Sequence, residues 1–143
     1  MHSPRFYMDH IIHFLMSHSR HGTHSPFVYR LVDEVIYAPR KVGERRDKVQ
    51  RLISRLVSRF KPDFVIINGN NVEAIASQLG RVWPHLHAGS VLILNDIYRN
   101  RRMKALWQIV QERPDVTVTI DLFHLGLVFF HKGQAKEDFR IRF

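Results

Sequence analysis

A polar turn that follows an apolar run is the first part of the chain that could bind a ligand. The turn is Asn68-Gly69-Asn70-Asn71, between the run 63–67 and a segment with helical character. Backbone N–H groups at the start of a helix can hold an anion. A dinucleotide-type loop, however, needs several glycines so that the backbone approaches the ligand closely, and this chain contains no G-x-G. We therefore expect an ordinary turn with an asparagine cap, and Asn68, Gly69, Asn70 and Asn71 are the residues that would contact a cofactor if one binds.

The crowding of histidines in the N-terminal part raises the question of a metal site. The chain has 10 histidines, and five of them are His10, His13, His18, His21 and His24. Imidazoles three residues apart on a helix can share one face, as zinc ligands do. No cysteine or carboxylate completes an obvious ligand set, so we expect hydrogen-bonded and surface histidines, and no metal.

Basic side chains are in excess, with 22 Lys and Arg against 13 Asp and Glu, a formal net charge of +9. One group lies on the helix predicted at 44–60, and a second follows residue 98. The members are Lys48, Arg51, Arg55 and Arg59 in the first group, and Arg99, Arg101, Arg102 and Lys104 in the second. Such cations can contact phosphates or acidic partners. No recognised nucleic-acid motif accompanies them, so a solvated helix face is the expectation.

Composition restricts the class of protein further. A chain of 143 residues is the size of one domain, and 45% hydrophobic residues suffice for a core. The absence of cysteine excludes disulfides, thiolate zinc sites and a cysteine nucleophile. The N-terminus lacks the uninterrupted apolar stretch of a secretory signal, and apolar runs such as 125–130 are too short to cross a bilayer. We expect a cytoplasmic protein with no membrane partner.

The first 60 residues are predicted to be helical. Helical spacing of apolar residues predicts a first helix over 8–16. Ser25 and Pro26 stand where an N-cap and a first helical residue belong, and the helix they begin should stop before Pro39. A third helix is predicted over 44–60.

From residue 61 onward, strands and helices are predicted to alternate. Strands alternating with helices indicate an α/β fold with a mainly parallel sheet and helices on its faces. The expected strands are 63–67, 90–94, 116–120 and 126–130, the expected helices end near residues 83 and 111, and the tail 139–143 is expected as a short edge strand.

Several stretches together resemble a family of class I S-adenosylmethionine-dependent methyltransferases found in bacteria. They are the "HGTHSPF"-containing stretch 20–29, the stretches 62–70, 91–98 and 116–130, and the ending Arg140-Ile141-Arg142-Phe143. The second stretch looks like that fold's fourth strand with its loop, and the third is similar to the fifth strand with its terminal acidic pair. The resemblance covers nearly the whole chain and implies a Rossmann-like fold.

The segment that carries the family's cofactor site has no counterpart in this chain. In the family, three strands precede the fourth; the first ends in a glycine-rich loop and the second in a carboxylate for the ribose. Here the third helix leads through Phe60-Lys61-Pro62 directly into what resembles strand four. The resemblance therefore implies a truncated sheet of about four strands with an antiparallel strand near one edge. The helices of residues 1–60 would pack on this sheet, and residues 61–143 would be the C-terminal half of one folding unit.

The resemblance also singles out Asp96. Asn68 and Asn95 stand where the family pattern suggests carboxylates, and an amide lacks the charge and basicity needed for metal binding or proton abstraction. Asp96 is thus the candidate catalytic residue, with helix capping as its alternative role.

Three hypotheses for function follow. The first is a methyltransferase-like domain that does not catalyse alone and binds no cofactor, acting by self-association or partner binding. A homodimer would form through strand 63–67, whose outer edge has lost its neighbour. The second is an S-adenosylmethionine-dependent methyltransferase whose site, lined by Asp96 and the turn 68–71, is completed by dimerisation or a partner chain. The third is a basic nucleic-acid-binding module.

Overall fold

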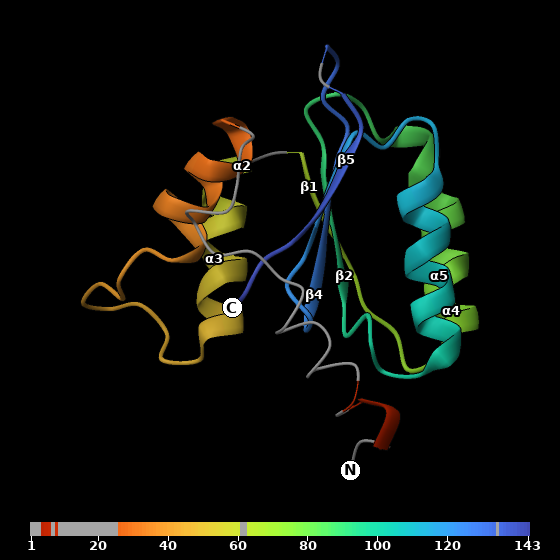
Figure 1. Ribbon diagram of the computed structural model, residues 1–143, viewed down its shortest axis with the longest axis horizontal. Coiled ribbons are helices and arrows are strands. Elements are labelled where there is room, and N and C mark those ends of the chain that lie inside the picture. Colours follow the sequence, from red (N-terminus) through yellow and green to blue (C-terminus); the bar gives the residue numbers. More distant parts are fainter. Residues whose placement is uncertain (1–3, 7, 9–25, 61–62, 134) are drawn as a thin grey trace.

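The computed structural model describes residues 4–6, 8, 26–60, 63–133 and 135–143. They form an α/β structure in which a five-stranded mixed sheet lies between two layers of helices (Figure 1). The predicted first helix beyond Met8 and the N-terminal histidines lie outside the described residues. Within the described ranges, no helix is both long and apolar enough to cross a membrane.

The sheet has the strand order β1-β2-β4-β3-β5. The pairs β1–β2 and β3–β5 are parallel, whereas β4 is antiparallel to both of its neighbours. The strands are β1 (Phe64–Ile67), β2 (Val91–Asn95), β3 (Val118–Asp121), β4 (Leu125–Phe129) and β5 (Glu137–Arg140).

The prediction of a mainly parallel sheet of about four strands is wrong on both counts. The C-terminal tail, expected as a short edge strand over 139–143, forms β5 over residues 137–140 at the edge beyond β3, and the sheet therefore has five strands. The antiparallel strand β4 lies at the centre of the sheet and not near one edge. Only Leu122, Phe123 and His124 separate β3 from β4, and a parallel connection needs a crossover of a dozen or more residues. The short loop therefore forces an antiparallel hairpin.

The helices begin where side chains satisfy their first N–H groups. Helix α2 (Pro26–Leu31) continues into a π-helical turn, η2 (Val32–Ile36), and the chain leaves the helix before Pro39 as predicted. Helix α3 (Lys48–Phe60) begins later than the predicted residue 44, because Asp47 Oδ1 accepts from the N–H of Gln50 at 2.9 Å. Asparagines cap α4 (Val72–Val82), which runs into the 3₁₀ turn η3 (Trp83–His85), and α5 (Arg101–Glu112).

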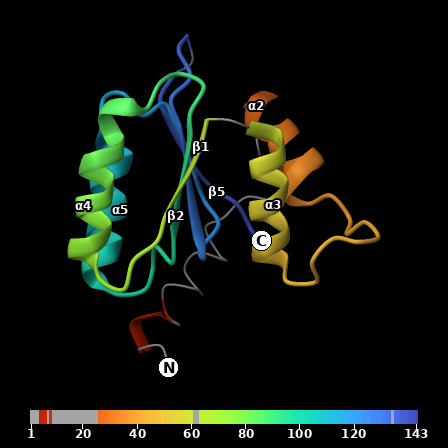
Figure 2. The ribbon, with the colours of Figure 1, turned by 180° about the vertical axis from the view of Figure 1, so that it is seen from behind.

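The hydrophobic core has one layer on each face of the sheet. Alternate residues of β2 face opposite layers, with Ile93 packed among the residues of α2 and α3, and Leu94 among those of α4 and α5. Figure 2, from behind, shows the sheet edge-on between these two helical layers. Gly126 in β4 lets α5 approach closely, because a Cβ there would lie 2.4 Å from the Trp107 ring.

Candidate functional site

The predicted site residues lie at the carboxyl edge of the parallel pair β1–β2. Open α/β sheets bind ligands at this edge. The turn 68–71 follows β1, and Asp96 follows the last residue of β2. The N-terminal segment reaches the same end of the molecule, where the Phe6 ring lies 4.9 Å from that of Phe123 (Figure 1). The structure thus brings the two candidate segments to one place.

Arg99 connects these two segments. Its Nη1 donates to the carbonyl oxygen of Gly69 at 2.7 Å, and its Nε lies 3.4 Å from Asp96 Oδ2. The guanidinium is partly buried, and its charge is compensated by the Asp96 carboxylate. The sequence identified Arg99 only as one member of a cationic group, because its short hydrogen bond is to a carbonyl thirty residues away in the chain.

The turn after β1 is closed by its own helix. Asn71 Oδ1 accepts from the N–H of Ala74 at 2.8 Å, which is the asparagine cap expected from the sequence. Gln78 Nε2 donates to the carbonyl oxygen of Asn68 at 2.6 Å. At Gly69 a Cβ would lie 2.9 Å from the Ile75 side chain, so the tight packing here needs glycine. These contacts account for the turn without any ligand.

Asp96 holds an unusual backbone conformation. Its φ is 59°, in the left-handed region, which aspartate adopts more readily than most residues. Its N–H donates to the carbonyl oxygen of His124 at 2.7 Å, which ties the end of β2 to the β3–β4 hairpin. The helix-capping alternative for Asp96 is wrong, because the cap of α5 is Asn100, whose Oδ1 accepts from Met103 N–H at 2.9 Å.

The β3–β4 hairpin beside this site contains a second left-handed residue and a buried acid. Phe123 has φ 69°, a true outlier for a bulky residue, and its ring stacks on Tyr98 with centroids 4.8 Å apart. Asp121 is 2% exposed and accepts from the Phe123 N–H at 2.9 Å and from the Tyr98 hydroxyl. Both carboxylate oxygens are therefore used to hold the strained turn. The signal in the sequence was an acid directly after an apolar, β-branched run.

The chemistry that this edge offers is limited by its internal bonds. The Asp96 carboxylate pairs with Arg99, and Asp121 is committed to the hairpin. In the part of the chain that the structure describes, no three His, Asp or Glu side chains come together in a way that could hold a metal ion. A ligand at this edge would meet a closed turn and one partly exposed carboxylate.

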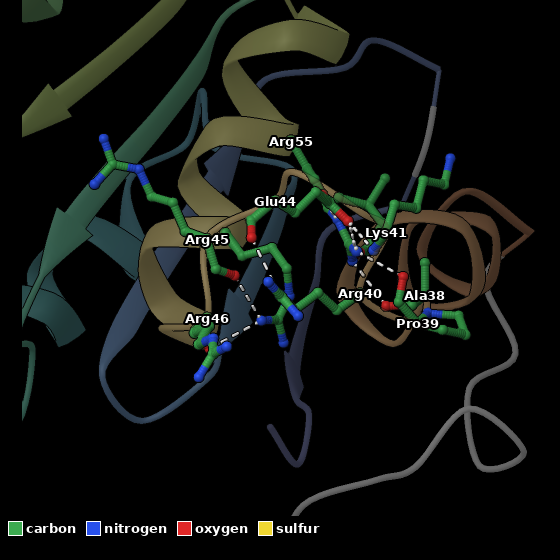
Figure 3. Close-up of polar contacts among 10 residues, drawn as sticks. Ala38, Pro39, Arg40, Lys41, Glu44, Arg45, Arg46 and Arg55 are labelled. Atoms are coloured by element: carbon green, nitrogen blue, oxygen red, sulfur yellow. Dashed lines mark hydrogen bonds and ion pairs between the residues drawn. The ribbon is translucent and has the colours of Figure 1, made fainter.

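The solvated face that the sequence predicted for the cations of α3 is found in part, because Lys48 and Arg59 are exposed whereas Arg51 and Arg55 are partly buried. All four have a partner within the chain. Lys48 Nζ donates to the Phe143 carbonyl oxygen at 2.7 Å, and Arg59 pairs with Glu34 at 2.9 Å. Arg51 and Arg55 reach into the loop that precedes α3 (Figure 3). In the second group of cations, Arg102 forms an ion pair with Glu73 across the α4–α5 contact.

Comparison with known proteins does not place the chain in a family. No family model, curated protein or solved structure matches it. The methyltransferase resemblance, carried by separate sequence stretches, therefore stays a prediction, and functional proposals have to be argued from the residues of the chain itself.

Proposed function

We propose that the chain is a methyltransferase-like cytoplasmic domain that acts by self-association and does not catalyse alone. The observation that carries this proposal is the position of β1. In the described residues, β1 is an edge strand that pairs with β2 only. In the methyltransferase fold the strand that β1 resembles has a parallel neighbour on its other side, the first strand, which carries the glycine-rich loop. The loss of that neighbour therefore has two effects: it removes a cofactor site, and it leaves the outer edge of β1 open.

The methyltransferase-like part of the proposal has support from the sheet. β1 and β2 are parallel neighbours, each followed by a helix, as the fourth and fifth strands of the family would be. A strand antiparallel to its neighbours, β4, is also present. These features agree with the resemblance, whereas β5 shares only Arg140 with the stretches that carry it.

The open edge of β1 is suited to pairing with a second copy. The Val91 N–H donates to the Asp63 carbonyl at 2.8 Å, so alternate residues from Asp63 face β2, and the backbone groups of Phe64 and Ile66 point outward. Monomeric proteins protect such edges with charged residues or proline within the strand. The sequence of β1, Phe-Val-Ile-Ile, has neither. Two copies related by a two-fold axis would join their sheets through this edge.

Proline at the outward position tests this dimer directly. Ile66→Pro removes an outward N–H while leaving the bonds to β2. Light scattering over a wide concentration range is expected to give a dimer for the wild-type chain and a monomer for the variant. Arg140→Pro is the matched control, because the Ile141 N–H faces β3 and the adjacent N–H of Arg140 therefore faces outward at the other edge. It should remain dimeric. Circular dichroism confirms that both variants fold, and a wild-type monomer at high concentration overturns the proposal.

The enzyme alternative is favoured by one observation, the bridge that Arg99 makes between Asp96 and Gly69. Calorimetric titration with S-adenosylmethionine and S-adenosylhomocysteine separates the two functions. The proposal predicts no binding to the dimer. Stoichiometric binding that disappears in the Ile66→Pro monomer would instead assign a cofactor site completed by dimerisation, with Asp96 and the turn 68–71 lining it.

A further inference from the structure

The loop between η2 and α3, residues 37–47, gathers positive charge on a projection from the molecule. Figures 1 and 2 show it extending from the helical layer, away from the sheet. We call it the basic loop, because its exposed side chains include Arg40, Lys41, Arg45 and Arg46. Charges of one sign repel each other in so short a segment. Other interactions must therefore hold the loop in one conformation.

Arg55 supplies most of these interactions, and it reaches from α3 into the base of the basic loop (Figure 3). Its Nε and Nη2 donate to the two carboxylate oxygens of Glu44, each at 2.7 Å. Nη1 donates to the carbonyl oxygens of Val35 and Ala38 at 2.7 and 2.9 Å. Nη2 also donates to Pro39 O at 2.9 Å. A guanidinium has five N–H donors, and Arg55 thus commits all of them to the loop and its flanks.

The tip of the basic loop is fixed by a further set of bonds. The Lys41 N–H donates to Glu44 Oε1 at 2.7 Å, and the Glu44 N–H donates back to the Lys41 carbonyl at 3.1 Å. Gly43, with φ 88°, permits this turn. Arg51 Nη1 donates to the carbonyl oxygens of Arg45 and Arg46, each at 3.0 Å. The backbone at the basic positions is therefore ordered before any ligand arrives, which reduces the entropy lost on binding.

The cations around the loop divide into two sets with different roles. Arg51 and Arg55, from α3, donate hydrogen bonds to backbone carbonyl groups of the loop and its flanks, and Arg55 also donates to Glu44. The side chains of Lys41, Arg45 and Arg46 are exposed and have no hydrogen-bond or ion-pair partner among the described residues. Arg40 uses its Nε on the Glu44 carbonyl at 3.1 Å. Figure 3 shows the Arg45 side chain pointing away from the bonded cluster. The hydrogen bonds of Arg51 and Arg55 thus order the backbone that carries the exposed cations.

We infer that the basic loop binds the phosphate backbone of a nucleic-acid duplex. Guanidinium groups match phosphate oxygens in geometry as well as charge. Single-strand binding uses aromatic platforms for base stacking. The one aromatic residue of the basic loop, Tyr37, lies at its base and donates its hydroxyl to the Arg142 carbonyl oxygen, and residues 38–47 include no aromatic side chain. The apolar tip is one exposed valine, Val42, whose burial would contribute only about 1.5–3 kcal/mol. That is less than the burial of one acyl chain, which by itself gives only marginal binding to a membrane. The basic loop is expected to contact the phosphate backbone of the duplex and therefore to show no sequence preference.

The test measures binding of the full chain to short DNA and RNA duplexes of unrelated sequence over a range of salt concentration. With three or four phosphate contacts, log K is expected to fall with log salt at a slope of about −3 to −4 on DNA. Arg45→Gln/Arg46→Gln should make this slope shallower by about 2 and weaken binding about tenfold or more at low salt. Arg81→Gln/Arg101→Gln removes the same charge from exposed positions on α4 and α5 and should leave the slope unchanged.

Binding to DNA alone, to RNA alone or to both supports the inference and identifies the duplex that the loop accepts. Absence of binding to either duplex at low salt overturns it. Equal weakening by the two double variants overturns it as well, because the attraction would then come from net charge and not from the basic loop. Tighter binding to a single strand or to vesicles rich in phosphatidylserine would assign the loop to another partner.

Discussion

Arg55 and Arg99 each hold a turn of the chain, but they differ in burial and in the number of hydrogen bonds that they donate. The Arg55 side chain is 13% exposed and bonds a carboxylate and three carbonyl groups. The Arg99 side chain is 24% exposed and has one short bond to a carbonyl, with its carboxylate partner 3.4 Å away. The more elaborate polar structure thus supports the basic loop, and the simpler one lies where the sequence predicted a cofactor site. Of these two arginine clusters, the one with more hydrogen bonds therefore orders a charged surface loop and not the predicted cofactor site.

Removing each guanidinium measures how much each arginine contributes to stability. Arg55→Met leaves a carboxylate and several carbonyl groups without their donor, and we expect a loss of about 3 kcal/mol in the free energy of unfolding. Arg99→Met should cost about 1 kcal/mol, in the range of a partly exposed pair and one hydrogen bond. Urea denaturation followed by circular dichroism measures both. Equal losses would show that the two arginines are equivalent supports.

Lysine at position 55 separates the effect of the positive charge from the effect of the guanidinium's hydrogen-bond geometry. Arg55→Lys keeps the positive charge, but an ammonium group cannot reproduce the planar set of five donors. We expect faster amide hydrogen exchange over residues 38–46 and duplex binding weakened about tenfold at an unchanged salt slope, because the number of cations stays the same. The matched variant Arg99→Lys should leave duplex binding as it is. A wild-type exchange rate in Arg55→Lys would mean that the loop is ordered without the guanidinium.

The pH dependence of stability reports the strength of the Arg55–Glu44 pair. The Arg55 hydrogen bonds, and then the Lys41 N–H, lower the pKa of Glu44 from 4.5 to about 2. Since the folded pKa is depressed, the stabilisation is fully present above pH 4.5 and is lost as the pH falls toward 2. The difference in unfolding free energy between the wild-type chain and Glu44→Gln should therefore shrink over that range. A difference that does not change with pH would show that the pKa of Glu44 is the same in the folded and unfolded chains.

The sequence was sufficient to locate most elements, because their signals are local. Buried β-branched runs marked β1 and β2 to within a residue, and Pro26 marked the start of α2. An antiparallel strand was predicted, but near one edge and not at the position of β4. Alternation and burial do not encode strand direction, whereas the three-residue loop before β4 does. The start of α3 was misplaced because Glu44, Arg45 and Arg46 have helical propensity, whereas the side chain of Asp47 caps the helix at the next residue.

The candidate sites show the same division between local and distant signals. The Asn71 cap lies three residues from its partner and could be predicted from the turn alone. The Arg99–Gly69 bond and the Tyr98–Asp121 contact join residues far apart in the chain, so only the folded sheet reveals them. Arg55 was predicted to face solvent as part of a cationic helix face, and its partner Glu44 was placed in the same predicted helix. In the structure Glu44 lies in the basic loop, and Arg55 supports that loop through its hydrogen bonds to Glu44.

The smallest expected effect concerns the backbone of Asp96. Glycine adopts φ near 59° without a steric cost, so Asp96→Gly relieves a strain of about 1 kcal/mol while losing a partly exposed ion pair worth at most about as much. The two changes should nearly cancel, leaving the free energy of unfolding within about 0.5 kcal/mol of wild type. Asp96→Ala loses the pair and keeps the strain, so it should be less stable than the glycine variant by about 1 kcal/mol. If instead both variants are destabilised alike and strongly, the Asp96–Arg99 bridge holds this edge of the sheet as firmly as Arg55 holds the basic loop, and the contrast between the two regions no longer stands.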